Sequence, residues 1–247
     1  MALSGTQVGI KVGTANAGLV SSVKPSAKTN SITRSGIGGF TKNKITNHNY
    51  EFGWEGDFVD ASVLKIALPV NGIPPEIDIT IHDLKYAGAH ITKMSIKGDQ
   101  DSTLTYSATA IAKGGSKVDA VIPVDPGMFL VFRDATITFG TSTAKITAFT
   151  IDISTKATPI YGTSIDPTDF QFGATEYSGS FTIVPDTSLE EVLKGAGDGT
   201  PYTFSIAGTG FNISGSGVIT TESAGQIKAD GDVTIVHSIK ADSITIS

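Results

Sequence analysis

Short stretches in which apolar and polar residues alternate dominate the chain from Tyr50 onward. Tyr50, Phe52 and Trp54 occupy alternate positions, and the same period recurs in EIDITIHD at 76–83. A period of two places every second side chain on one face of a β-strand. Turn-forming residues separate these stretches at short intervals. The pattern therefore predicts an all-β protein with a β-sandwich or barrel architecture.

Two segments have the pattern of β-hairpins. Residues 89–115 contain two alternating runs separated by KGDQDS at 97–102, in which glycine and aspartate favour a turn. Residues 134–155 contain two further runs separated by GTST at 140–143. We predict a hairpin in each segment.

Helix signals are few, and they predict one or two short helices. Ser188 precedes Leu189, and Glu191 lies three residues after Ser188. This spacing is that of a capping box, and it predicts a helix over 188–194 that Gly195 terminates. The segment DASVLKIAL at 60–68 carries a weaker signal for a turn or two of helix starting near Asp60 or Ser62.

An internal repeat accompanies these helix signals. Residues 56–81 contain a Gly-x-Phe step, an Asp-x-Ser step, an apolar run, a Gly-x-Pro break and a strand, and residues 179–207 contain the same features in the same order. Chance is the alternative, because glycine and serine are common in this chain. The shared order favours two tandem modules, at 50–115 and 131–247, joined by a linker at 116–130.

Charge separates the N-terminal residues from the rest of the chain. The chain has 247 residues and a net charge of −6, yet residues 1–50 hold no acidic residue. Their basic residues are Lys11, Lys24, Lys28, Arg34, Lys42 and Lys44. We predict that residues 1–49 form a flexible basic arm, partly a strand of the first module, that orders on assembly against an acidic neighbour. Nucleic-acid binding and a solvated leader without a partner remain alternatives.

Candidate chemistry is sparse. The chain has no cysteine, and its histidines at 48, 82, 90 and 237 have no spacing typical of a metal site. Glu190 and Glu191 are neighbours on the predicted helix and cannot flank a substrate. The sequence therefore predicts no catalytic residue, no metal and no cofactor, and we expect that the protein is not an enzyme. No apolar run is long enough to cross a bilayer, and the start MALSGTQVGIKVG lacks a secretory signal, so we expect no membrane partner.

The segment ITAFTIDISTKATPIYGTSIDPTDFQFGATEYSGSFTIVPDTSLEEVLKG at 146–195 resembles the major tail tube proteins of tailed bacteriophages and archaeal tailed viruses. The similar features are the alternating strand at 150–153, the Pro-x-Asp connection at 167–169, the strand at 177–182 and the short helix at 188–194. The segment 83–114 resembles the strand, turn and strand that come earlier in that family. The first fifty residues match least.

This resemblance implies a structural virion protein of the viral tail that is assembled in the host cytoplasm. Its subunits would join sheets into rings, and the rings would stack into a hollow tube for the ejection of viral DNA, which passes without specific binding. Its partners would be further copies of itself and the tape measure, terminator and baseplate proteins. Two modules per chain favour trimeric rings with pseudo-sixfold symmetry, and hexameric rings are the alternative. A β-sandwich surface module that binds carbohydrate or a receptor is the second hypothesis, for which a single tryptophan is thin support.

Overall fold

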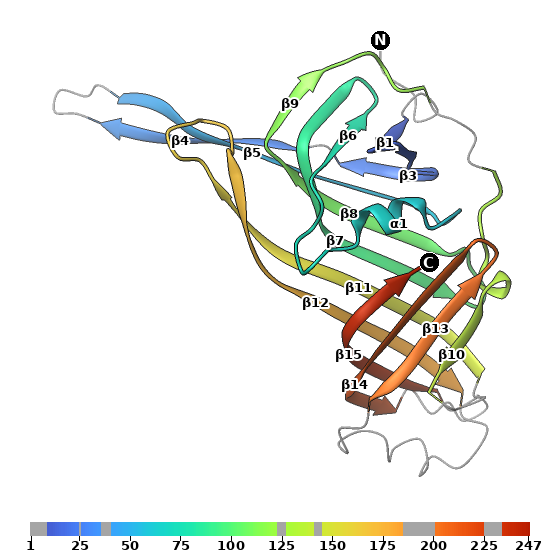
Figure 1. Ribbon diagram of the computed structural model, residues 1–247. Helices are drawn as coiled ribbons and strands as arrows, with labels where there is room; N and C mark the ends of the chain where they lie inside the picture. The colour runs from blue at the N-terminus through green and yellow to red at the C-terminus, as the bar shows by residue number, and fades with distance from the viewer. Residues whose placement is uncertain are drawn as a thin grey trace.

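The computed structural model describes residues 9–24, 26–35, 41–122, 127–140, 145–184, 201–224 and 234–247. Antiparallel strands make up almost all of this described part (Figure 1). The strands are β1 (Ile10–Val12), β2 (Ala15–Asn16), β3 (Leu19–Lys24), β4 (Ala27–Ser35), β5 (Thr41–Asp57), β6 (Ile77–Ile81), β7 (Leu84–Asp99), β8 (Thr105–Ala112), β9 (Gly114–Lys117), β10 (Thr136–Phe139), β11 (Lys145–Ile160), β12 (Asp169–Val184), β13 (Tyr202–Gly208), β14 (Phe211–Ala224) and β15 (Ile235–Ile246). The prediction of an all-β protein is confirmed.

The strands form one continuous antiparallel network. Its central path is β13-β14-β15-β12-β11-β7, and β7 continues through β8 to β5. β3 and β4 pair with successive parts of β5. The first half of β7 pairs with β6 and β9, whereas its second half pairs with β8 and β11. The long strand β7 therefore belongs to two layers whose apolar faces meet in one core.

The pairing order of the first half of the chain recurs in the second half. The first half pairs its strands in the order β1-β6-β7-β8-β5-β3. The second half pairs its strands in the order β10-β13-β14-β15-β12-β11. These counterparts also follow one another in the same order along the chain.

The repeat extends to the β-bulges, where one strand has an extra residue. Ser21 and Thr147 are the extra residues in the pairs β3–β5 and β11–β12, and Thr92 and Thr220 are those in β7–β8 and β14–β15. Each hydroxyl donates a hydrogen bond to a carbonyl oxygen of the paired strand. The acceptors are Glu55 (3.2 Å), Thr182 (3.3 Å), Thr109 (3.3 Å) and Ser238 (3.2 Å), respectively. Bulges are local insertions, so four at corresponding places identify corresponding residues.

The helix signal at 60–68 is confirmed, and the one at 188–194 lies outside the described residues. Helix α1 spans Ser62–Ala67, and the Asp60 carboxylate accepts a hydrogen bond from the Ser62 backbone N–H at 2.7 Å. α1 buries Val63, Leu64 and Ala67. A single 3-10 turn, η2 (Phe132–Asp134), is the other helical element described.

One predicted hairpin is right and the other is wrong. β7 and β8 pair across the KGDQDS turn as expected. β10 does not pair with β11, however. It pairs with β13, so that Phe139 lies opposite Phe204, and β11 pairs with β12 and β7. The local turn signal was misleading because pairing with distant strands buries more apolar surface than a local hairpin would.

Within the predicted arm at 1–49, the described residues are mostly in strands. Ile10 and Val12 on β1 are 4% and 0% exposed and pack in the core. β3, β4 and most of β5 form a long hairpin from the remaining described residues. Thr and Ile residues favour extended backbone even where few side chains are buried, which explains strands in a segment with little apolar patterning. Of the predicted linker, residues 118–122 and 127–130 lie outside strands.

His237 occupies a core position on β15. It is 2% exposed, and its ring lies 5.6 Å from that of Phe139. Burial lowers the pKa of this imidazole, because desolvation disfavours the charged form. The unfolded chain therefore binds a proton more readily than the folded chain.

We expect the His237 contribution to stability to be present above the ordinary histidine pKa and to be lost as the pH falls below about 6.5. Urea unfolding at pH 7 and pH 5 measures this. His237→Leu should flatten the dependence of the unfolding free energy on pH. An identical dependence in the variant and the parent chain would show that His237 is not responsible.

Candidate assembly surfaces

The main sheet has one apolar face and one polar face. Residues directly opposite in antiparallel strands share a face. Trp54, Ala108, Met94 and Ile153 form such a row on the buried face. The neighbouring row, on the other face, runs Glu55, Ser107, Ser95, Asp152, Ser178 and Lys240. The sheet thus covers its core on one side and presents polar side chains on the other.

Hydroxyl groups predominate on this polar face. The two flanking rows are Asp57, Thr105, Lys97, Thr150, Ser180 and Ser238, and Gly53, Thr109, Lys93, Ser154 and Glu176. The three rows together hold four acidic side chains (Glu55, Asp57, Asp152 and Glu176) and three basic ones (Lys93, Lys97 and Lys240), so their charges nearly balance. A continuous band of small polar groups with little net charge therefore crosses both halves of the chain. Such a band offers no cluster of cations to hold a phosphate backbone.

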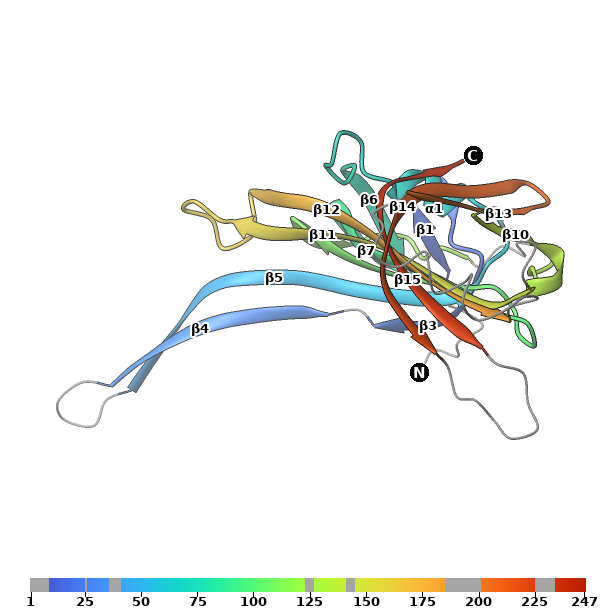
Figure 2. The same ribbon diagram turned by 90° about the horizontal axis from the view of Figure 1, so that it is seen from below.

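The hairpin of β4 and β5 extends away from the rest of the molecule (Figure 2). Every residue of β4 is exposed, and so are residues 41–46 of β5. Side-chain bonds link the two strands, as from Asn30 Nδ2 to Asn47 Oδ1 at 2.6 Å and from Thr33 Oγ1 to Asn43 Oδ1 at 2.7 Å. An isolated two-stranded hairpin is at best marginally stable in water, so this extension is suited to contact with another surface.

The predicted assembly residues separate into two groups. Lys11 lies on β1 and Lys24 at the end of β3. Lys28, Arg34, Lys42 and Lys44 lie on the extended hairpin, where Arg34 is opposite Lys42 and Ile32 is opposite Lys44. One face of the hairpin tip is therefore basic, and it surrounds an isoleucine that is 49% exposed.

Acidic residues gather at the other end of the same strands. Asp57 ends β5 and accepts a hydrogen bond from Thr103 Oγ1 at 3.0 Å. Asp99 and Asp101 are exposed in the adjacent β7–β8 turn, and Asp60 is exposed just after β5. The long axis of the sheet thus has a basic end and an acidic end.

A loop from the second half supports the base of the hairpin. The Asp166 carboxylate lies 2.8 Å from His48 Nδ1 and accepts a hydrogen bond from the Tyr50 hydroxyl at 2.9 Å. The hydrogen bonds from His48 and Tyr50 hold the pKa of Asp166 below its usual range. Burial, with a further contribution from Asp166, raises the pKa of Tyr50 to about 12. These contacts fix the direction in which the hairpin leaves the sheet.

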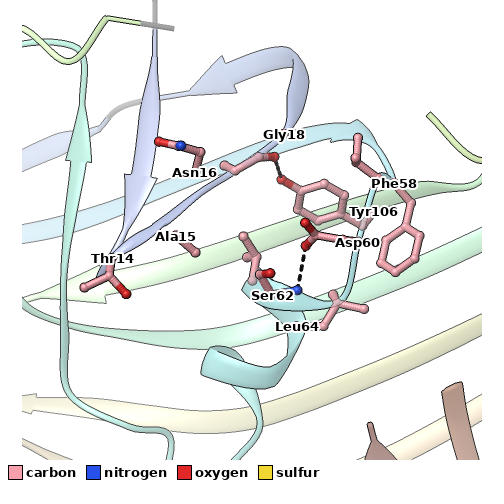
Figure 3. Close-up of a pocket in the computed structure, with 12 residues that line it drawn as sticks. Thr14, Ala15, Asn16, Gly18, Phe58, Asp60, Ser62, Leu64 and Tyr106 are labelled. Atoms are coloured by element: carbon pink, nitrogen blue, oxygen red, sulfur yellow. Dashed lines mark hydrogen bonds between the residues drawn. The ribbon is translucent and has the colours of Figure 1, made fainter. Parts of the chain in front are cut away.

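A cavity of about 250 Å³ lies between the β1–β2 turn and the start of α1 (Figure 3). Asp60 and Tyr106 are the ionisable residues that line it. The Tyr106 hydroxyl donates a hydrogen bond to the Ala17 carbonyl, and Asp60 accepts one from the Ser62 backbone N–H. Both groups therefore have structural partners.

The histidines do not assemble a site. The described residues contain no group of three histidine or acidic side chains that could hold a metal ion. His90 Nδ1 lies 2.8 Å from the Pro74 carbonyl oxygen, and its ring contacts Phe170 and Phe172. His82 and Asp83 form the turn between β6 and β7, in which His82 has a φ of 51°. In the described part of the chain, no helix is long and apolar enough to cross a membrane.

The all-β sheet with a polar face and an extended hairpin fits a protein that assembles with copies of itself. A model of the phage tail tube protein family matches residues 5–246. The chain belongs to this family, and it is a structural component of the virion tail. Comparison with curated proteins gives no significant match.

Two features of these surfaces were not predicted from the sequence: the continuity of the polar face and the extended shape of the hairpin. The polar face of the sheet was present in the sequence as serine and threonine at alternate positions, but only strand order shows that they form one band. The hairpin tip was predicted as a basic segment, although its extended shape was not. Its sequence signal was the run of threonine, asparagine and lysine without apolar periodicity at 41–49.

Proposed function

We propose that this chain is a tail tube subunit that assembles into stacked rings, and that the polar face of the main sheet lines the hollow centre through which viral DNA is ejected. The observation that carries this proposal is the continuous hydroxyl-rich band on the side of the sheet opposite the core. DNA carries one charge per phosphate, and a cationic lining would retain it. A nearly neutral hydroxyl lining lets the duplex pass without specific binding.

The chain consists of two tube modules in tandem, and three chains form a ring with pseudo-sixfold symmetry. The repeated strand order and the four corresponding bulges support this proposal. Ring closure depends on the rotation between neighbouring modules rather than on the peptide bond that joins them. Hexameric rings of this chain are the alternative.

Rings stack with the basic hairpin tip of one ring against the acidic end of the next. The hairpin and the acidic turns lie at opposite ends of the same strands, which suits a head-to-tail contact that repeats along a filament. Assembly takes place in the host cytoplasm, and the finished tube contacts the tape measure, terminator and baseplate proteins. We expect the tube to have no enzymatic activity, because the family of the chain is structural.

A surface module that binds carbohydrate or a receptor would expose a cluster of aromatic residues. The single tryptophan, Trp54, is 2% exposed and belongs to the core. The structure therefore gives the binding-module hypothesis no support beyond that from the sequence.

Negative-stain electron microscopy of the purified chain at increasing concentration tests the tube proposal. Stacked rings or long hollow tubes are the expected result. Discrete particles at every concentration, with no ring in any class average, would overturn the proposal. A parallel hydrolase screen should be blank, and an activity that is lost in Asp60→Asn would contradict the structural role.

A further inference from the structure

At the junction between the two halves of the chain, β7 and β11 pair with each other, whereas their counterparts elsewhere in the fold have no such partner among the described strands. The second half of β7, at 93–99, pairs on one side with β8 and on the other side with β11, at 148–154. The bulge residues Thr92 and Thr220 make 221–224 of β14 the described counterpart of 93–96, and this part of β14 pairs with β15 on one side. The pairing of β14 with β13 ends at Gly217, which lies opposite Tyr202, and no strand of the described chain occupies the edge of β14 beyond it.

The counterpart of β11 also lacks a strand partner on one edge among the described strands. β11 pairs with β12 on one side and with β7 on the other. Its counterpart, formed by β3 and the start of β4, pairs with β5 alone among the described strands. Unpaired backbone N–H and C=O groups on such edges favour the addition of another strand.

We propose that the edge at 26–28, which includes the start of β4, in one chain pairs with the edge of β14 at 221–223 in a second copy, in the register by which β11 pairs with β7. This inference rests on the proposed self-assembly and specifies its interface. The occupant is a second copy because the matching edge within the chain, on β7, is already taken by β11.

The bulges set the register between the two copies. Asp152 lies five residues after the bulge at Thr147, and Ser26 lies five residues after the bulge at Ser21. Ser95 and Ser223 each lie three residues after the bulges at Thr92 and Thr220. Because Asp152 pairs with Ser95, Ser26 pairs with Ser223 of the second copy.

The same rule places Lys28 opposite position 221 of the second copy. Lys28 corresponds to Ser154 and position 221 corresponds to Lys93, and Ser154 pairs with Lys93 inside the chain. An antiparallel ladder then runs from Ser26 to Lys28 along β14 of the neighbour. Repetition of this contact continues the main sheet, with its polar face on one side, from chain to chain.

An exposed isoleucine supports this arrangement independently. Phe172 lies opposite Ala157, which is the first pair beyond the second bulge of the β11–β12 ladder. Its ring lies 4.8 Å from that of His90. Ile45 lies opposite Ser31, which is the first pair beyond the corresponding bulge of the β4–β5 ladder, and it is 49% exposed. The counterpart of His90, two residues before the bulge threonine, is the half-buried Val218. The interface therefore covers Ile45 of one chain with Val218 of the next.

Cysteine pairs test the register directly, because the chain has no cysteine of its own. Two double variants carry matched pairs: Lys28→Cys with Thr221→Cys, and Ser26→Cys with Ser223→Cys. In each, the proposed register places the Cα atom of one chain directly opposite that of the next, within the range of a disulfide. The exchanged combinations, 28 with 223 and 26 with 221, are matched controls. Their Cα atoms lie about 7–8 Å apart, beyond disulfide reach.

The assembled protein is oxidised gently and analysed by denaturing gel electrophoresis without reductant. We expect covalent multimers from the two matched pairs and monomers from the two exchanged pairs. Rings or tubes in which the matched pairs stay monomeric overturn this interface and leave the tube proposal standing. Absence of rings and tubes in the cysteine-free chain overturns both.

The apolar contact has its own test. Ile45→Asp and Val218→Asp should each raise the chain concentration needed for ring formation by about tenfold or more, which corresponds to about 1.4 kcal/mol. Ile122→Asp, at a residue that is 78% exposed, is the control and should leave this concentration unchanged. Ring formation by both interface variants at the parent concentration would contradict the contact. Circular dichroism spectra should match the parent for all three.

Discussion

Reversing the charge of Arg34, Lys42 and Lys44 together to glutamate is expected to yield folded rings that no longer stack into tubes. These residues form the basic face of the hairpin tip, and all of them are exposed, so their replacement removes no core contact. Each surface ion pair contributes at most about 1 kcal/mol, but the contact repeats around every ring. Tube length in electron micrographs at low and high salt measures the effect.

A matched control reverses the same number of charges elsewhere. Lys65, Lys117 and Lys156 are exposed on α1, β9 and β11, and their reversal to glutamate should leave tubes intact. If the hairpin tip meets the acidic end of the next ring, Asp99→Lys with Asp101→Lys should restore stacking in the triple hairpin variant. Tubes of normal length from the hairpin variant itself would show that the tip has no part in stacking.

Phe181→Ala is expected to cost about 3–5 kcal/mol of unfolding free energy, because it leaves a cavity between two layers of the fold. The Phe181 side chain is fully buried, and its ring lies 4.8 Å from Phe139 and 5.5 Å from Phe204. That cost is a large fraction of the stability of a typical domain, which is about 5–15 kcal/mol. Urea unfolding measures it.

Phe129→Ala is the control, because Phe129 is 41% exposed. Its unfolding free energy should stay within about 0.5 kcal/mol of the parent value. If Phe181→Ala lowers the unfolding free energy by less than about 1 kcal/mol, Phe181 is not packed between the two layers.

The sequence allowed the strands to be predicted wherever one face is buried. Ile79 and Ile81 alternate with polar residues because one side of β6 meets the core, and the β7–β8 hairpin has a local turn. Pairing between distant strands leaves no such local sign. For this reason the partner of β10 was predicted wrongly.

The candidate surfaces were predictable only in part. The charge of the segment around Lys42 and Lys44 indicated a contact surface, but its strands have no apolar face that would reveal an extended hairpin. The serine and threonine residues of the polar face look like an ordinary solvated side in each strand. They become a candidate lumen only when strand order joins them into one band.

Cryo-electron microscopy of the assembled protein tests the central claim most directly. We predict hollow tubes of stacked rings, each with three chains, in which the sheet runs unbroken from chain to chain and Ser107, Ser95 and Ser178 face the lumen. A reconstruction with six chains per ring, each contributing a single sheet module, would contradict the tandem arrangement. A reconstruction with the apolar core face or the hairpin tip lining the channel would contradict the account as a whole.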